Sequence, residues 1–312
     1  MKRGVLLFIF VFFIMGMLFV YFFIPINTVQ YEWNSGTSGN PTVENSNFNI
    51  NSSYEGMQFY NNMRYRTKDI SYKIYNACPL KRQNDVTEAL DIISNATILS
   101  FYPVESNEEI SITCSYENIV EGNAFVGGEG GVTNVTVAGN YNIIFNGKVL
   151  LLRDSECYNP NIAIHELLHA LGFDHSDNPN NIMYPTSSCD QTIGEDIPSL
   201  IKQLYSIEPA PDLVFENLSA VMNGKYLDAN LSVRNKGFED APDFKIIISV
   251  DGKEIKEIES SGLAIGYGNK ITLTNLWVNK ISVNQIEFTI STDYAELNKD
   301  NNVAVSTFGK SS

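Results

Sequence analysis

The chain has 312 residues, which is enough for about two domains with separate hydrophobic cores. Its hydrophobic fraction of 44% and its charged fraction of 18% are those of a globular protein rather than a disordered one. With 36 acidic and 21 basic residues the net charge is −15, and no stripe of Lys or Arg could neutralise phosphates. These values exclude nucleic acid as a partner.

The first 25 residues predict a membrane anchor. Lys2 and Arg3 precede an uncharged apolar run, Val5–Ile24, which Pro25 ends. Such a run is long enough to cross the hydrocarbon core of a bilayer, and no A-x-A-like cleavage site follows it. We therefore expect residues 1–25 to form a single transmembrane helix, with the rest of the chain outside the cell. The alternative is a cleaved signal peptide and a secreted protein.

Residues 26–66 are rich in Asn, Ser, Gly and Thr and show little apolar periodicity. This composition is typical of a polar linker, so we predict a tether between the anchor and the first folded domain.

The next region, residues 67–208, mixes strand and helix patterns and predicts an α+β domain. Gly-rich residues 122–139 are interpreted as a long loop, and residues 142–152 as a hairpin that turns at Asn146-Gly147. The remaining elements expected in this domain are strands near 70–77, 99–104 and 110–115 and helices near 83–98, 161–171 and 197–205.

Four cysteines occur in the chain, and none forms a C-x-x-C pair. In an exported protein an even number of cysteines at such spacings indicates two disulfides, although four cysteines allow three pairings. The candidates are Cys78, Cys114, Cys157 and Cys189.

All three histidines of the chain lie in one window of eleven residues, which has the sequence HELLHALGFDH. His165 and His169 are four residues apart, so a helix presents both imidazoles on one face, where they can bind one metal ion. Gly172 permits the turn that ends this helix and returns His175 as a third ligand. Three neutral ligands leave one tetrahedral position for water, and Glu166 is placed to act as its general base. The pattern therefore predicts one catalytic Zn²⁺.

The sequence HExxHxxGxxH resembles the signature of the metzincin peptidases, in which a Met-turn follows. Here Met183, in the sequence Asn181-Ile-Met-Tyr-Pro185, matches that turn, and Ser176 after the third histidine is similar to the matrixin subgroup. The resemblance implies that Met183 forms a hydrophobic floor below the metal. It is specific over residues 165–185, and the cysteine-switch pro-segment of matrixins has no counterpart here.

The resemblance also bears on the cysteines. Cys157 precedes the motif helix and Cys189 follows the Met-turn, two segments that meet if both surround the metal. We therefore expect Cys157 to pair with Cys189, which leaves Cys78 with Cys114.

Residues 212–308 alternate in short strands separated by turn signals, which predicts an all-β, immunoglobulin-like sandwich. Asp212-Leu-Val, Val233-Arg-Asn-Lys-Gly237 and Glu296-Leu-Asn-Lys-Asp-Asn-Asn302 resemble a CARDB domain, an adhesion-related module of prokaryotic surface proteins. The resemblance makes this domain a candidate for binding a surface partner.

Together these features predict a zinc endopeptidase on the cell membrane that hydrolyses peptide bonds of extracellular or envelope proteins with a metal-activated water. The alternative is an inactive, metal-holding adhesion protein, which would have no need of Glu166.

Overall fold

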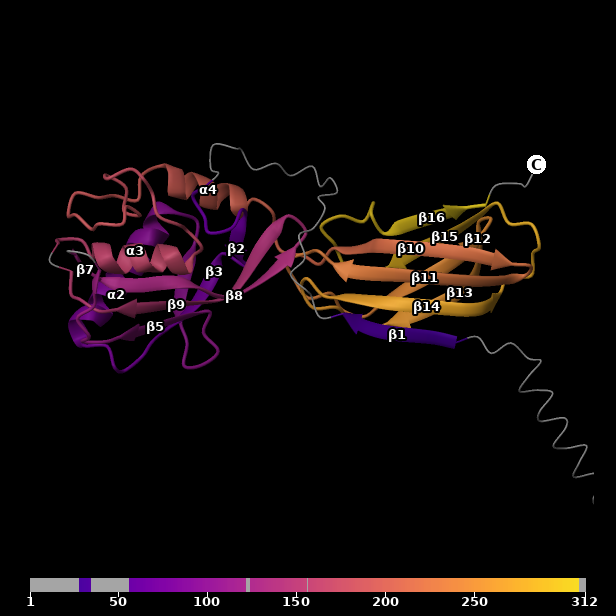
Figure 1. The fold of residues 1–312 in the computed structure, drawn as a ribbon, viewed down its shortest axis with the longest axis horizontal. Coiled ribbons are helices and arrows are strands. Elements are labelled where there is room, and N and C mark those ends of the chain that lie inside the picture. Colours follow the sequence, from indigo (N-terminus) through magenta and orange to yellow (C-terminus); the bar gives the residue numbers. More distant parts are fainter. Residues whose placement is uncertain (1–27, 35–55, 122–123, 156, 309–312) are drawn as a thin grey trace, which may run out of the picture.

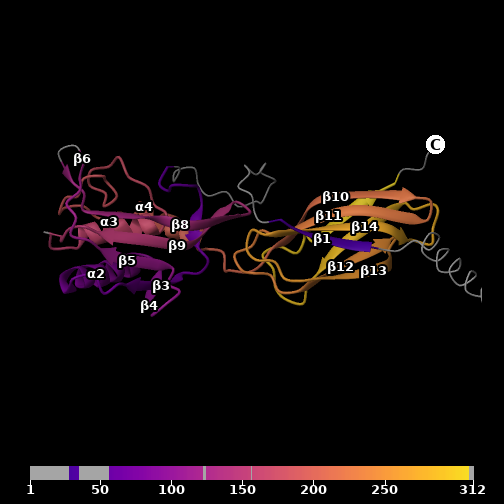
Figure 2. The same cartoon turned by 60° about the horizontal axis from the view of Figure 1, so that its bottom comes forward.

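The computed structural model describes residues 28–34, 56–121, 124–155 and 157–308. They form two folded units joined end to end, an α/β domain made of residues 56–207 and a β-sandwich (Figure 1). Figure 2, turned about the long axis, shows the same two units side by side along that axis.

The α/β domain is built on a mixed sheet whose strand order is β2-β9-β5-β3-β4, with β8 paired to β9. All neighbours in this order are parallel, whereas β8 is antiparallel to β9. Two helices, α2 and α3, bury apolar residues in the same core as the sheet. The bounds are β2 (Met63–Tyr65), β3 (Asp69–Ile74), α2 (Leu80–Ala96), β4 (Ser100–Pro103), β5 (Ile110–Cys114), β6 (Val120–Glu121), β7 (Ala124–Phe125), β8 (Gly128–Ala138), β9 (Tyr141–Leu151), α3 (Asn161–Ala170) and α4 (Asp196–Leu204).

Two predictions for this domain are wrong. The Gly-rich segment interpreted as a loop contains the strand β8, and all but the last residue of 142–152 belong to one continuous strand, β9, instead of a hairpin. The turn of the hairpin lies between β8 and β9, where Gly139 has a φ of 57°. Position 147, within β9, is occupied by glycine because no side chain fits there. A Cβ would be 2.6 Å from the Tyr65 hydroxyl and 2.9 Å from the carbonyl of Ala170.

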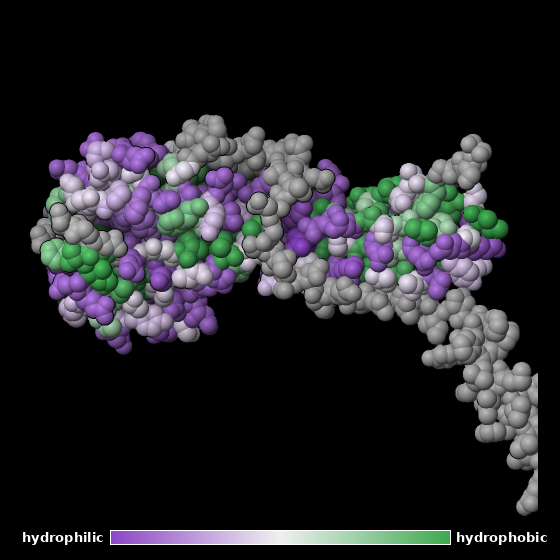
Figure 3. Space-filling view, viewed as in Figure 1, coloured by the Kyte–Doolittle hydropathy of each residue, from purple (hydrophilic) through white to green (hydrophobic). Residues whose placement is uncertain are grey.

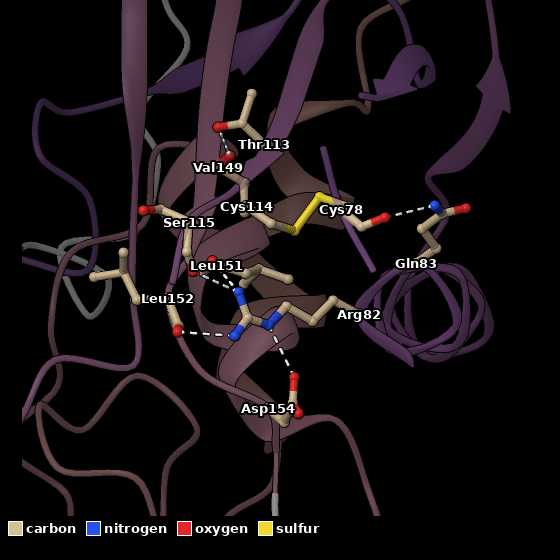
Figure 4. The surroundings of a disulfide bond; sticks show 10 residues. All are labelled: Cys78, Arg82, Gln83, Thr113, Cys114, Ser115, Val149, Leu151, Leu152 and Asp154. Carbon is tan, nitrogen blue, oxygen red and sulfur yellow. Dashed lines mark hydrogen bonds and ion pairs between the residues drawn. A yellow bond between two sulfur atoms is a disulfide. The ribbon is translucent and has the colours of Figure 1, made fainter. Parts of the chain in front are cut away.

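Both disulfides join the expected pairs, Cys78 with Cys114 and Cys157 with Cys189. Beside the first of them lies Arg82, only 4% exposed, which donates hydrogen bonds to the carbonyls of Ser115, Leu151 and Leu152 and pairs with Asp154 (Figure 4). One buried guanidinium thus joins the N-terminal turn of α2 to the ends of β5 and β9.

The sandwich packs two four-stranded antiparallel sheets around its own core, with orders β1-β14-β11-β10 and β13-β12-β15-β16. Its strands are β1 (Thr28–Asn34), β10 (Leu213–Asn223), β11 (Tyr226–Asn235), β12 (Phe244–Val250), β13 (Lys253–Ser260), β14 (Gly268–Trp277), β15 (Gln285–Ser291) and β16 (Val303–Thr307). The alternation of buried and exposed residues along these strands follows the sequence pattern.

The predicted linker is not a linker along its whole length. Residues Thr28–Asn34 form β1, which pairs with the edge of β14. Near the other end, Phe59 N–H donates to the carbonyl of Gly172, and Met57 accepts a hydrogen bond from the N–H of Asp174. The side-chain composition of this segment did not predict the β1 pairing or these hydrogen bonds, because backbone groups make them.

The two domains share a buried junction, defined here by Arg64, Tyr141, Tyr205 and Phe238. The Arg64 guanidinium, 2% exposed, lies 4.3 Å from the ring centroid of Tyr205 and 4.6 Å from that of Phe238. It also donates to the carbonyls of Leu204 and Ile207, at the end of α4 and in the connection. Phe238 comes from the sandwich, yet it is buried in the core of the α/β domain and contacts Tyr141 edge-on at 4.8 Å. The junction therefore fixes one domain on the other.

Within the part of the chain that the structure describes, no helix is long and apolar enough to cross a membrane. The predicted anchor, residues 1–25, lies outside that part.

Candidate metal centre

The helix α3 carries the histidine motif and is buried on most of its surface. Pro160 lies before its first residue and fixes the backbone for helix entry. Ile164, Leu167 and Leu168 are at most 3% exposed and anchor the helix in the core. Gly172 ends it with a φ of 95°, a conformation that other residues rarely adopt. The motif is therefore held on a rigid element.

The three histidines converge on one point. The Nε2 atom of His169 lies 3.0 Å from Nε2 of His165 and 3.2 Å from Nε2 of His175. Candidate ligand atoms of all three residues lie within 4.8 Å of one another. A tetrahedral zinc ion with bonds of about 2.0–2.1 Å separates its nitrogen ligands by about 3.3–3.4 Å, so the spacing suits such an ion.

The outer ring nitrogens show which nitrogens face the ion. Nδ1 of His165 is 2.7 Å from the carbonyl of Ile182, and Nδ1 of His169 is 2.8 Å from that of Phe173. Because a carbonyl only accepts, each Nδ1 carries the proton and each Nε2 presents a lone pair. Two lone pairs 3.0 Å apart repel unless a cation lies between them. The donor set therefore fits a metal ion.

Burial reinforces this state. It lowers the pKa of His165 to about 4 and also lowers the pKa of His169, while the hydrogen bonds to Ile182 and Phe173 oppose the shift. Both imidazoles are therefore neutral near pH 7, the form that binds metals.

The turn around Met183 supports two of the three histidines. Met183 is 2% exposed, and its carbonyl accepts a hydrogen bond from Ser176, which follows the third histidine. The carbonyl of the preceding residue, Ile182, is the partner of His165. Asn181 holds the turn itself, because its side chain accepts from the N–H of Met183 and donates to Asp196 at the start of α4.

Glu166 lies beneath the edge strand β8. It is 6% exposed, and burial raises its pKa to about 8, opposed by a hydrogen bond from the backbone of Gly130. A Cβ at Gly130 would lie 2.1 Å from the carbonyl oxygen of Glu166, and one at Gly128 would lie 2.8 Å from its Cγ. These glycines let the strand pass directly over the helix.

Sequence reasoning named the three histidines, Glu166 and Met183, and the structure gathers them around α3 and the following turn. The sequence did not indicate Phe59, whose ring stacks on His169 with the ring centroids 5.5 Å apart, or the role of Asn181. The glycines at 128 and 130 carried a signal, their clustering, which was interpreted as a long loop.

A parallel sheet with an antiparallel edge strand, a three-histidine centre on its helix and a methionine turn below define a metallopeptidase-like domain, here joined to a sandwich. Residues 64–206 match the Matrixin family and residues 210–306 match the CARDB family, so a matrixin-like domain is followed in this chain by a CARDB-like domain.

Two curated relatives match this chain. Macrophage metalloelastase of Rattus norvegicus is 30% identical over 141 residues, and matrix metalloproteinase-18 of Xenopus laevis is 32% identical over 135. The matches cover 39% and 40% of this chain and only 28% of each relative. Among solved structures, a CARDB domain from Pyrococcus furiosus is 24% identical, over 30% of this chain and 84% of that one, with a TM-score of 0.26.

Proposed function

We propose that this protein is a zinc endopeptidase that hydrolyses internal peptide bonds of proteins outside the cell. The observation that carries the proposal is the convergence of three Nε2 atoms, with Nδ1 of His165 and His169 held by backbone carbonyls. The matrixin match supports a metallopeptidase at the level of the domain.

His165, His169 and His175 would hold one zinc ion, since three ligand atoms this close suit a single ion with one open position. Zinc, when bound, supplies a Lewis acid that polarises the scissile carbonyl and lowers the pKa of a coordinated water. Glu166 would be the general base. Burial alone raises its pKa to about 8, and a cation held by the three histidines would lower that pKa again. The carboxylate would then accept a proton from the attacking water and return it to the leaving amine, so that a C–O bond replaces the C–N bond. Gly130 holds this carboxylate from β8.

The test is Glu166→Gln, which keeps the shape of the side chain and removes the base. Hydrolysis of a mixed peptide library should fall at least about a hundredfold, while zinc content measured by mass spectrometry stays unchanged. A protein that binds zinc but cleaves no peptide, with or without this substitution, would be the inactive adhesion protein instead.

We further propose that the enzyme acts at the outer surface of the cell. Two disulfides fit an oxidising compartment outside the cytoplasm. The apolar run Val5–Ile24, with Lys2 and Arg3 before it, would hold the chain in the membrane. N-terminal sequencing of the mature protein from the membrane fraction should find residues before Pro25.

A further inference from the structure

The end of the sandwich remote from the α/β domain exposes large apolar side chains. Val221 is 56% exposed, Trp277 46% and Ile281 75%. Tyr226 packs edge-on against Trp277, and Lys225 lies over the same indole ring. We call residues 221–226, 251–252 and 277–281 the sandwich tip. Figure 3 shows hydrophobic residues at this end of the molecule.

Hydrogen bonds join the separate segments of the tip. Val278 N–H donates to the carbonyl of Lys225, and Lys280 pairs with Asp251 in the turn between β12 and β13. The turns that carry the exposed apolar side chains are therefore fixed relative to one another.

The strand β1 begins at the tip. Its first residue, Thr28, lies opposite Thr274, three residues before Trp277, and its last residue, Asn34, lies opposite Gly268. Figure 1 shows β1 running along the sandwich toward the α/β domain. The apolar run Val5–Ile24 ends four residues before Thr28 in the sequence. A chain that leaves the membrane at Ile24 therefore enters the sandwich at its tip.

The metal centre lies toward the other end of the molecule. The strand β11 runs from Tyr226 at the tip to Asn235, three residues before the junction residue Phe238. Its 10 residues at about 3.3 Å each span about 30 Å. Because Arg64 and Phe238 fix the junction, this separation is maintained.

We propose that the sandwich tip rests on the lipid surface and holds the peptidase domain away from it. Trp and Tyr concentrate at membrane interfaces, where their rings lie at the level of the headgroups, and Lys reaches the phosphates. Val221 and Ile281 would add buried apolar area. The CARDB domain is then a spacer that sets the active site at least about 30 Å from the bilayer, within reach of envelope proteins rather than of lipid. The inference rests on the proposed anchor.

The chain contains its own control, because it has two tryptophans. Trp277 is at the tip, whereas Trp33 lies opposite Asn269, eight residues or about 26 Å along β14. In the Trp33→Phe variant all tryptophan emission comes from Trp277 at the tip. In the Trp277→Phe variant it all comes from Trp33. The full-length chain would be reconstituted in phosphatidylcholine vesicles with bromine in the upper part of the acyl chains, and tryptophan emission compared with that in unbrominated vesicles.

The Trp33→Phe protein should lose at least about half of its emission in brominated vesicles, as a ring at headgroup level requires, and the Trp277→Phe protein almost none. Equal emission from Trp277 in brominated and unbrominated vesicles would overturn the proposal. If Trp277 were also shielded from acrylamide while bromine did not quench it, a second copy of the chain would cover the tip, and this too would overturn the proposal. Failure of the vesicles to retain the chain would refute the anchor and this inference with it. Peptide hydrolysis by the same preparations, compared with Glu166→Gln, reports separately on the proposed activity.

Discussion

Gly130 lies where β8 crosses the motif helix, whereas a Cβ at its neighbour Gly131 would meet no atom within 4 Å, so the two glycines form a matched pair. Gly130→Ala should push β8 off Glu166 and lower kcat/KM at least about tenfold, because small misplacements at a reacting centre are costly. Gly131→Ala should change it little. Peptide hydrolysis at equal zinc content is the measurement, and equal effects of the two substitutions would contradict the role given to Gly130.

The buried ionisable groups predict how pH affects the metal-free protein. The folded pKa of His165, about 4, is below the ordinary 6.5, so its contribution to stability is present above pH 6.5 and is lost as the pH falls through 4. Glu166 acts in the opposite direction, because its folded pKa of about 8 makes its contribution disappear as the pH rises from 4.5 through 8. In a chelated Glu166→Gln protein, urea unfolding should therefore show stability falling on acidification, and His165→Gln should flatten that slope. An unchanged slope would contradict the burial of this imidazole.

At the scale of single residues, the sequence was sufficient to name the three candidate metal ligands that the structure brings together, because their spacing within one helix and one turn is local. The partners that orient them are distant in sequence. Ile182 and Phe59 contact His165 and His169 through the fold, and neither bears a side chain that marks such a role.

At the scale of elements, the two disulfides allow a comparison, since they join residues at similar separations of 36 and 32. Loss of either should destabilise the fold by about 3–4 kcal/mol in urea unfolding. Only Cys157–Cys189 encloses α3 and the Met183 turn. Serine at both of these positions should therefore speed zinc loss to a chelator, whereas serine at Cys78 and Cys114 should not. Equal zinc loss from both variants would show that the enclosure does not stabilise the site.

The helices and most strands followed from periodicity, but glycine misled the prediction of the β8–β9 hairpin. Glycine was interpreted as a turn signal at Gly147 and as a loop signal at residues 128–131. In the structure these glycines permit close approach, Gly147 to Ala170 and Gly130 to Glu166. A single sequence does not distinguish a glycine that bends the chain from one that admits a neighbour.

At the scale of the molecule, Phe238 tests whether the domains behave as one body. Phe238→Ala removes the ring between Arg64 and Tyr141 and should cost about 3–5 kcal/mol. Calorimetry should then show two separate transitions in place of one. Phe288→Ala, in the core of the sandwich alone, is the control and should lower the sandwich's stability without separating the domains. A single transition in the Phe238 variant would show that the junction does not depend on this ring.

The pairing of β1 with β14 also sets an order of events during synthesis. The acceptor strand leaves the ribosome roughly 230 residues after β1, a delay of about 12–50 s at 5–20 residues per second. In that interval the peptidase domain between them can fold and close both of its disulfides, while β1 has no edge to join. The matrixin-like domain would therefore form its candidate metal centre before the sandwich is complete, and closure of the sandwich by its own first strand would be the last step.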